Sequence, residues 1–210
     1  MVEALYVGAI VALGGSSGGR ASEAYGHLAD LYRGRAYHNL HHIKATLETY
    51  LLIAENLPTE TGAQITLALC YHDAVYDSQA KDNEAKSAEL AEKELAELGI
   101  AAEDRAEVAR LIQLTKHHQV ADRDEAGAIV VDADLAILQT SPDEYDRYAT
   151  AIREEYSWVP DEEYRAGRTK VLEGLLSRRL FSSPLLDEEL AKANLRREVD
   201  TLLTRSATAK

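Results

Sequence analysis

The sequence is poor in the residue types that mark secreted and membrane proteins. It contains one cysteine, Cys70, which excludes an intramolecular disulfide and favours a reducing compartment, so we expect a cytoplasmic protein. The apolar stretch 4–13 is too short to span a bilayer and lacks the basic residues that precede the apolar part of a secretory signal. The sequence therefore predicts no membrane partner.

Basic residues are also scarce. The chain has 23 Lys and Arg against 36 Asp and Glu, a formal net charge of -13. Binding a nucleic-acid polymer needs clustered Lys and Arg to neutralise phosphates, so this balance argues against that class of partner. It does not exclude a nucleotide, because a bound metal ion can supply the positive charge that the protein lacks.

No segment alternates convincingly as a strand, and helix-forming residues with 3.6-residue apolar spacing dominate from Arg20 onward. We therefore expect an all-α protein with one helical domain over residues 20–204. Residues 1–19, which end in a Gly and Ser stretch, are predicted to be a flexible leader, and 204–210 are expected to fray. The predicted helices cover 22–32, 37–57, 59 or 61 to about 70, 83–98, 103–118, 128–138, segments opened by Pro142 and Pro160, and about 187–203.

Six of the seven histidines fall in three short clusters. A histidine and an aspartate, His72 and Asp73, stand side by side at the end of an apolar helix, and Asp134 lies inside another apolar run. A buried polar pair is costly unless something compensates it, and a metal ion is a common partner. A lone histidine on an apolar face is more often a hydrogen-bonded core residue, so the metal hypothesis depends on the whole set. The clusters are His38, His41 and His42; His72; and His117 and His118.

The order His42, His72-Asp73, Asp134 resembles that of the HD-domain metal-dependent phosphohydrolases, whose signature is H…HD…D on an all-α scaffold. The similarity extends over about residues 22–203 and favours the subgroup described as predicted metal-dependent HD superfamily phosphohydrolases. The segments that carry it in the N-terminal half are 37–43 (YHNLHHI), 72–77 (HDAVYD), Asn83-Glu84, Ser87-Ala88, Leu111-Ile112, Thr115, His118 and 132–135 (DADL). In the C-terminal half they are 151–153 (AIR), Glu155-Tyr156, Gly167-Arg168 and 193–195 (ANL).

The resemblance implies an HD-type helical bundle that hydrolyses a small phosphorylated molecule, for example a nucleotide, with water activated by a divalent metal. The implied ligands are two imidazoles and two carboxylates, with Asp134 favoured over Asp132 by the signature. This mixed set suits Mn²⁺, Mg²⁺, Fe²⁺, Co²⁺ or Ni²⁺ better than a closed structural zinc site. The four implied ligands are His42, His72, Asp73 and Asp134.

Further residues are assigned to catalysis and substrate binding. Asp77 follows Asp73 by four residues, so it lies on the same side if the helix continues, and we expect Asp77 and Asp73 to be catalytic. An ordinary loop residue is the alternative for Asp77. In some HD hydrolases an acidic pair occupies this stretch, and here Tyr76 replaces its first member. His38, one helical turn before His42, is predicted to contact substrate together with His118 and Arg168.

Two other functions fit the same residues. The surplus histidines are compatible with a second metal ion, and hence with an HD-fold oxygenase that uses two irons. A helical protein that binds a metal or a nucleotide without turnover is the third hypothesis. The sequence leaves the substrate and the oligomeric state open.

Overall fold

A computed structural model describes residues 1–16 and 18–207, with side chains up to residue 204. The protein is all-α, as predicted: the described residues form ten α-helices and one short 3₁₀ helix, with no strand. The described residues fall into two compact units, an N-terminal unit up to Asp134 and a C-terminal unit from Leu135 onward. The single domain over 20–204 stays a prediction. No helix among the described residues is both long enough and apolar enough to cross a membrane.

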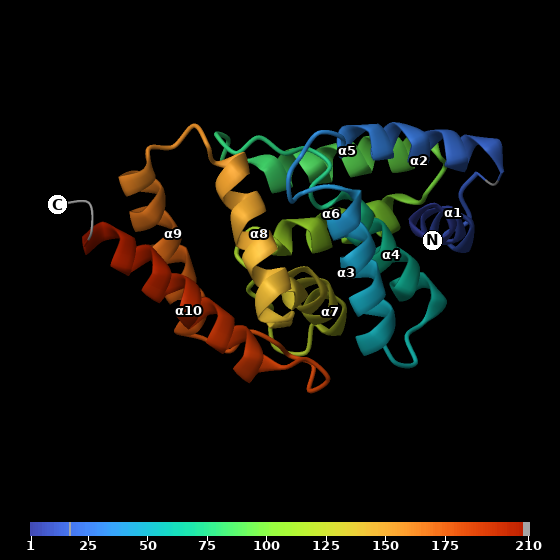
Figure 1. Ribbon diagram of the computed structural model, residues 1–210. Coiled ribbons are helices and arrows are strands. Elements are labelled where there is room, and N and C mark those ends of the chain that lie inside the picture. Colours follow the sequence, from blue (N-terminus) through green and yellow to red (C-terminus); the bar gives the residue numbers. More distant parts are fainter. Residues whose placement is uncertain (17, 208–210) are drawn as a thin grey trace. The chain divides into compact units, whose positions relative to one another are not determined.

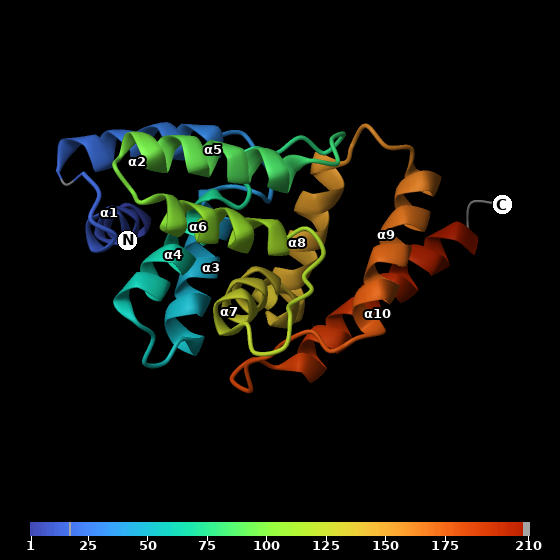
Figure 2. The same ribbon diagram turned by 180° about the vertical axis from the view of Figure 1, so that it is seen from behind.

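The N-terminal unit is organised around α4, whose residues Ala63–Tyr71 are all buried. A helix that is apolar all round must be covered on every side, and α4 packs against α1, α3, α5 and α6. In the same unit, α5 and α6 pack side by side (Figures 1 and 2). The helices are α1 (Val2–Ala12), α2 (Gly19–Leu31), α3 (Leu40–Ile53), α4 (Thr59–Tyr71), α5 (Asn83–Glu97), α6 (Ala102–Leu114) and α7 (Glu125–Leu135).

The expectation of a flexible leader differs from the structure. Residues 2–12 form α1, where the side chains of Tyr6 and Ile10 are fully buried. The hydroxyl of Tyr6 hydrogen-bonds that of Tyr71 on α4 at 2.8 Å. The apolar stretch read as a leader is thus one face of the core, and its Tyr6 finds the polar partner that a buried tyrosine needs. Residue 17 of the predicted leader, and 208–210 of the predicted frayed end, lie outside the described residues.

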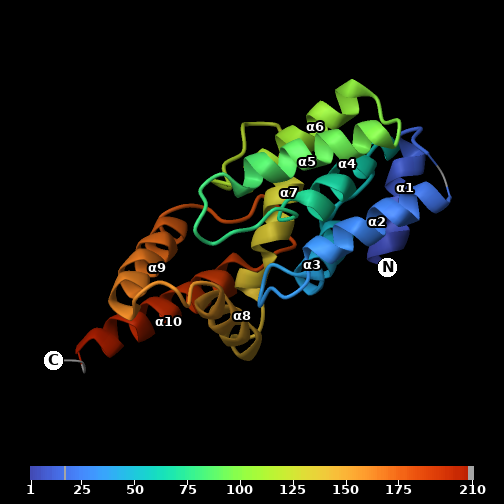
Figure 3. The same cartoon turned by 90° about the horizontal axis from the view of Figure 1, so that it is seen from above.

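The C-terminal unit consists of three helices and the 3₁₀ segment. Ser141 caps α8 by accepting a hydrogen bond from the Glu144 N–H, and Pro142 occupies the first turn, as the sequence predicts. Helix α10 packs along α9 (Figure 3) and also contacts η1 and α8. The elements are η1 (Ala136–Gln139), α8 (Pro142–Glu155), α9 (Asp161–Leu176) and α10 (Glu188–Ala207).

Candidate metal centre

Two helix ends and one helix start bring the predicted ligands together within the N-terminal unit. Asn39 caps α3 by accepting hydrogen bonds from the N–H groups of His41 and His42, which fixes the first turn that carries His42. His72 is the C-cap of α4, and Asp73 follows it in the turn. Asp134 lies at the end of α7.

The side chains of His42, His72 and Asp134 form a buried group in which each offers one ligand atom within 4.8 Å of the others. The two Nε2 atoms are 3.1 Å apart, and the Asp134 Oδ1 lies 3.2 Å from His42 Nε2 and 3.4 Å from His72 Nε2. Donor atoms about 2.1 Å from one ion are about 3.0–3.4 Å apart between right-angle and tetrahedral arrangements. The spacing therefore fits a single divalent ion.

Asp73 lies at the edge of this group. Its Oδ2 is 3.0 Å from His72 Nε2 and 3.6 Å from His42 Nε2. It contacts both imidazoles, but it is not among the three residues whose donor atoms all lie within 4.8 Å of one another. Its assignment as the fourth ligand stays a prediction.

The ring of His72 is oriented as a metal ligand requires. Its Nδ1 lies 2.9 Å from the carbonyl oxygen of Leu69, which can only accept, so Nδ1 carries the hydrogen. The lone pair of the neutral ring is then on Nε2, which faces the other donors. Histidines that bind metals are commonly fixed in this way by a carbonyl on the opposite nitrogen.

The electric field of the group attracts positive charge. Burial lowers the pKa of His72, but the carboxylates of Asp73 and Asp134 outweigh burial and raise this pKa well above its usual value. Burial raises the pKa of both carboxyls, yet the neighbouring imidazoles leave them below their ordinary range. The pKa of His42 is lowered, mainly by burial. Two carboxylates that pull a proton onto His72 would equally stabilise a metal cation at that place.

His118 supports Asp134 from outside the group. Its Nε2 lies 2.9 Å from Asp134 Oδ2, the oxygen that does not face the imidazoles. The backbone of His118 has φ +50°, in the left-handed region that residues other than glycine seldom adopt. Strain of this kind is tolerated where a side chain must be held in a particular place. The predicted helix 103–118 actually ends at Leu114, which leaves His118 in this turn.

The turn after His72 is held by residues that sequence reasoning missed. The guanidinium of Arg35 donates hydrogen bonds to the carbonyl oxygens of Asp73 and Ala74, and it lies over the ring of Tyr76. The hydroxyl of Ser87 accepts from the Val75 N–H at 3.0 Å. Nothing in the local sequence of Arg35 predicts this role, whereas Ser87 belongs to a segment of the family resemblance.

Two geometric arguments made from the sequence are wrong. Helix α4 ends at Tyr71, so Asp77 is not one helical turn beyond Asp73. It is exposed, and its carboxylate accepts the Gln79 N–H at 2.9 Å, as in an ordinary Asx turn. His38 precedes the cap of α3 and so shares no helix face with His42. Catalysis by Asp77 stays a prediction.

The remaining predicted residues lie in varied surroundings. The His38 ring stacks on Tyr76 with centroids 4.0 Å apart, and it meets His42 edge-on at 6.1 Å. Substrate contact by His38 and His118 stays a prediction. Arg168 belongs to the C-terminal unit, where it is partly buried and forms a two-pronged ion pair with Glu198 at 2.8 and 3.0 Å. That pair gives Arg168 a structural role, and nothing tests its contact with substrate.

Comparison of the chain with protein-family models, with curated proteins and with solved structures found no match in any of the three. The function must therefore be argued from the site itself.

Proposed function

We propose that this protein is an HD-type, metal-dependent phosphohydrolase that acts on a small phosphorylated molecule. The observation that carries the proposal is the convergence of His42, His72 and Asp134, from three separate helices, in one buried group that fits a divalent ion. Their order along the chain, with Asp73 beside His72, follows the H…HD…D signature. Helical proteins can adopt many functions, so the site and not the fold supports this proposal.

His42, His72 and Asp134 would hold the ion, with Asp73 as the fourth ligand. When bound, a divalent ion supplies a Lewis acid for a phosphoryl oxygen and makes a water molecule more acidic. The protein's own contribution is orientation: the Leu69 carbonyl fixes the tautomer of His72 and His118 holds Asp134. His118 Nε2 and Asp134 Oδ2 lie within hydrogen-bond distance, at 2.9 Å, so His118 is placed to orient this carboxylate.

The same reasoning suggests the substrate and the metal. A chain with a net charge of -13 repels phosphate anions in general, so a local cation is needed to bind one. We infer a small phosphorylated substrate, for example a nucleotide, and Mn²⁺, Mg²⁺, Fe²⁺, Co²⁺ or Ni²⁺ as the metal. With a single, buried cysteine, the protein suits a reducing cytoplasm, and we place its activity there.

Phosphate release from a panel of phosphomonoesters and nucleotides tests the proposal, with each metal added in turn and with EDTA. We expect release that requires metal and falls by at least about 100-fold in Asp134→Asn. Asp82→Asn is the matched control, because Asp82 is exposed and its carboxylate pairs with Lys86, away from the metal centre. Equal release by the wild type and Asp134→Asn, or metal binding without release from any compound, would contradict it.

The same samples separate the two other hypotheses. Two irons per chain with a charge-transfer absorption band would support an oxygenase. Bound metal without turnover, together with a nucleotide that raises the melting temperature, would support a binding protein.

A further inference from the structure

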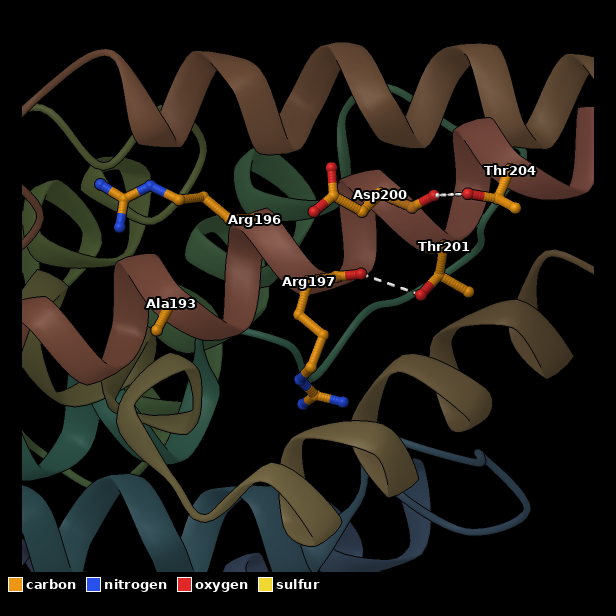
Figure 4. A pocket seen from close by; sticks show the side chains of 6 residues that line it. All are labelled: Ala193, Arg196, Arg197, Asp200, Thr201 and Thr204. Carbon is orange, nitrogen blue, oxygen red and sulfur yellow. Dashed lines mark hydrogen bonds between the residues drawn. The ribbon is translucent and has the colours of Figure 1, made fainter.

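A cavity of about 490 Å³ lies within the C-terminal unit, between α8, α9 and α10. Arginines from all three helices reach it, together with a tyrosine ring and two threonines. The lining residues used here are Thr150, Arg153, Tyr164, Arg165, Arg197 and Thr201. Figure 4 shows Arg197 and Thr201 where they also border a shallower depression along α10. All lining residues of that depression come from α10, and its Arg196 is exposed.

The carboxylates that line the cavity are already neutralised. Asp146 pairs with Arg197 at 2.6 Å, and Asp161 pairs with Arg153 at 2.6 Å. The third, Glu198, is held by the two-pronged contact with Arg168 described above. Each carboxylate is thus matched by one guanidinium.

Arg165 is the guanidinium left over from this pairing. Its Nε is buried and makes no hydrogen bond, and its side chain forms no ion pair within 4.0 Å among the described residues, although its charge helps to lower the pKa of Asp161. The side chain is only partly exposed, so its charge lacks full compensation from water. A guanidinium without an ion-pair partner is costly to remove from water, and an anion bound by its terminal N–H groups would offset that cost.

The combination of features distinguishes Arg165 from the other arginine with a buried, unpartnered Nε. Arg105, on α6, shares that feature but lines none of the described cavities. An orphan Nε alone therefore marks no site. At Arg165 it coincides with a cavity that two further guanidiniums line, each of them from a different helix and paired with its own carboxylate.

We propose that this cavity binds a small organic anion through its phosphate group, with Arg165 making the principal contact. A guanidinium presents its N–H groups as a planar fork that matches phosphate oxygens. A doubly charged group would compensate Arg165 and also gain from Arg153 and Arg197. The volume far exceeds that of one ordered water, about 30 Å³, so an organic body fits beside Tyr164. This site uses no residue of the metal centre.

Equilibrium dialysis of the full chain against labelled inorganic phosphate tests the proposal, with EDTA present so that no metal recruits phosphate, and at constant ionic strength. We expect saturable binding of one phosphate per chain, weakened about 10- to 100-fold in Arg165→Gln. Arg165→Lys, which keeps the charge but not the fork, should lie between. Arg196→Gln removes the same charge from the exposed surface of α10 and should bind as the wild type does.

Two further measurements, a competition experiment and a fluorescence titration, make the test decisive. Glycerol phosphate should compete with inorganic phosphate, and succinate should compete much less. Trp158, the single tryptophan, stacks on Tyr156, whose ring neighbours Tyr164, so its fluorescence should change with the same affinity. Equal affinity in the wild type and Arg165→Gln, no saturable binding at millimolar phosphate, or preferential binding of succinate would overturn the proposal. An unchanged circular dichroism spectrum and metal content establish that each variant is folded.

Discussion

At the scale of single residues, His72 shows how one side chain is prepared for a cation. It is almost fully buried, its Nδ1 is committed to the Leu69 carbonyl, and two carboxylates face its Nε2. In the metal-free protein these carboxylates favour a proton on Nε2. A metal ion must displace that proton, because only the neutral imidazole is a ligand.

This competition predicts that metal affinity rises with pH. The raised pKa of His72 keeps the ring protonated in the metal-free protein, whereas Asp73 and Asp134, with lowered pKa values, stay charged throughout. Affinity for Mn²⁺ should increase by up to about tenfold per pH unit from roughly pH 6 to pH 8, since one proton is released. Isothermal titration calorimetry in buffers of different ionisation enthalpy measures the Mn²⁺ affinity and the number of protons released. A pH-independent affinity would refute the account.

The proton on His72 also affects the stability of the metal-free protein. Because the folded-state pKa is raised, the stabilisation is fully present below the unfolded value of about 6.5 and is lost as pH rises through the folded pKa. The metal-free chain should therefore lose stability over the same range in which metal binding strengthens. Added Mn²⁺ should raise the melting temperature more at high pH than at low pH.

Asn39 is a single residue that positions the metal ligand His42. Replacing it with Ala removes the cap of α3 and should cost about 1 kcal/mol of stability. Because the cap also fixes the turn that carries His42, we expect Mn²⁺ affinity to fall about tenfold. Ser141→Ala removes the cap of α8 in the other unit and should leave this affinity unchanged. If both variants bind Mn²⁺ equally well, the cap does not position the ligand.

At the scale of elements, the start of α7 sets where Asp134 is placed. Asp124 accepts the Gly127 N–H at 2.9 Å and is itself held by the guanidinium of Arg110. A Cβ atom at Gly127 would lie 2.7 Å from Leu114 Cδ1 and would press on the Asp124 carboxylate. The glycine is thus needed for the close approach of α7 to its neighbours.

Gly127→Ala should therefore destabilise the protein by about 1–3 kcal/mol and weaken Mn²⁺ binding as α7 shifts. Gly26→Ala is the control: a Cβ there meets nothing within 4 Å, and α2 should gain about 0.5–1 kcal/mol. Urea unfolding and Mn²⁺ titration measure both effects. A Gly127→Ala variant as stable as the wild type would show that the start of α7 is not tightly packed.

Helix α1 gives the second prediction at this scale. Tyr6→Ala should cost about 3–5 kcal/mol, because it empties a buried site and removes the partner of the Tyr71 hydroxyl. Val11→Ala, at a half-exposed position of the same helix, should change stability by less than about 0.5 kcal/mol. Urea unfolding distinguishes the two. Equal, small effects would mean that α1 behaves as the flexible leader expected from the sequence.

Helix existence was predictable from the sequence, and helix ends were less so. Apolar periodicity and opening prolines located the nine helices after the N-terminal segment, because both signals are local in the sequence. Asn39 is a residue type that favours caps, yet the predicted helix began before it, at residue 37. The position of α1 was missed because a short apolar stretch followed by Gly and Ser also fits a loose terminus.

At the scale of the whole molecule, the sequence predicted which residues carry chemistry better than how they are held. The order of His42, His72-Asp73 and Asp134 identified all three members of the buried group. Arg35, Asn39 and Asp124 hold the segments that carry the ligands through hydrogen bonds. These bonds join residues distant in sequence or depend on the geometry of a helix cap, and no local sequence pattern specifies them. For the same reason the sequence did not show that Arg168 is committed to Glu198, since ion pairing between α9 and α10 is a tertiary property.

The central claim is that the N-terminal unit holds a divalent metal ion between His42, His72 and Asp134. Its most direct test is elemental analysis of protein loaded with Mn²⁺ and desalted, for the wild type, Asp134→Asn, Asp73→Ala and the surface control Asp82→Asn. We predict about one or two ions per chain in the wild type and the control, and loss in the other two variants. Equal, near-zero metal in all four would contradict the account and reduce the His and Asp group to a buried ion-pair network.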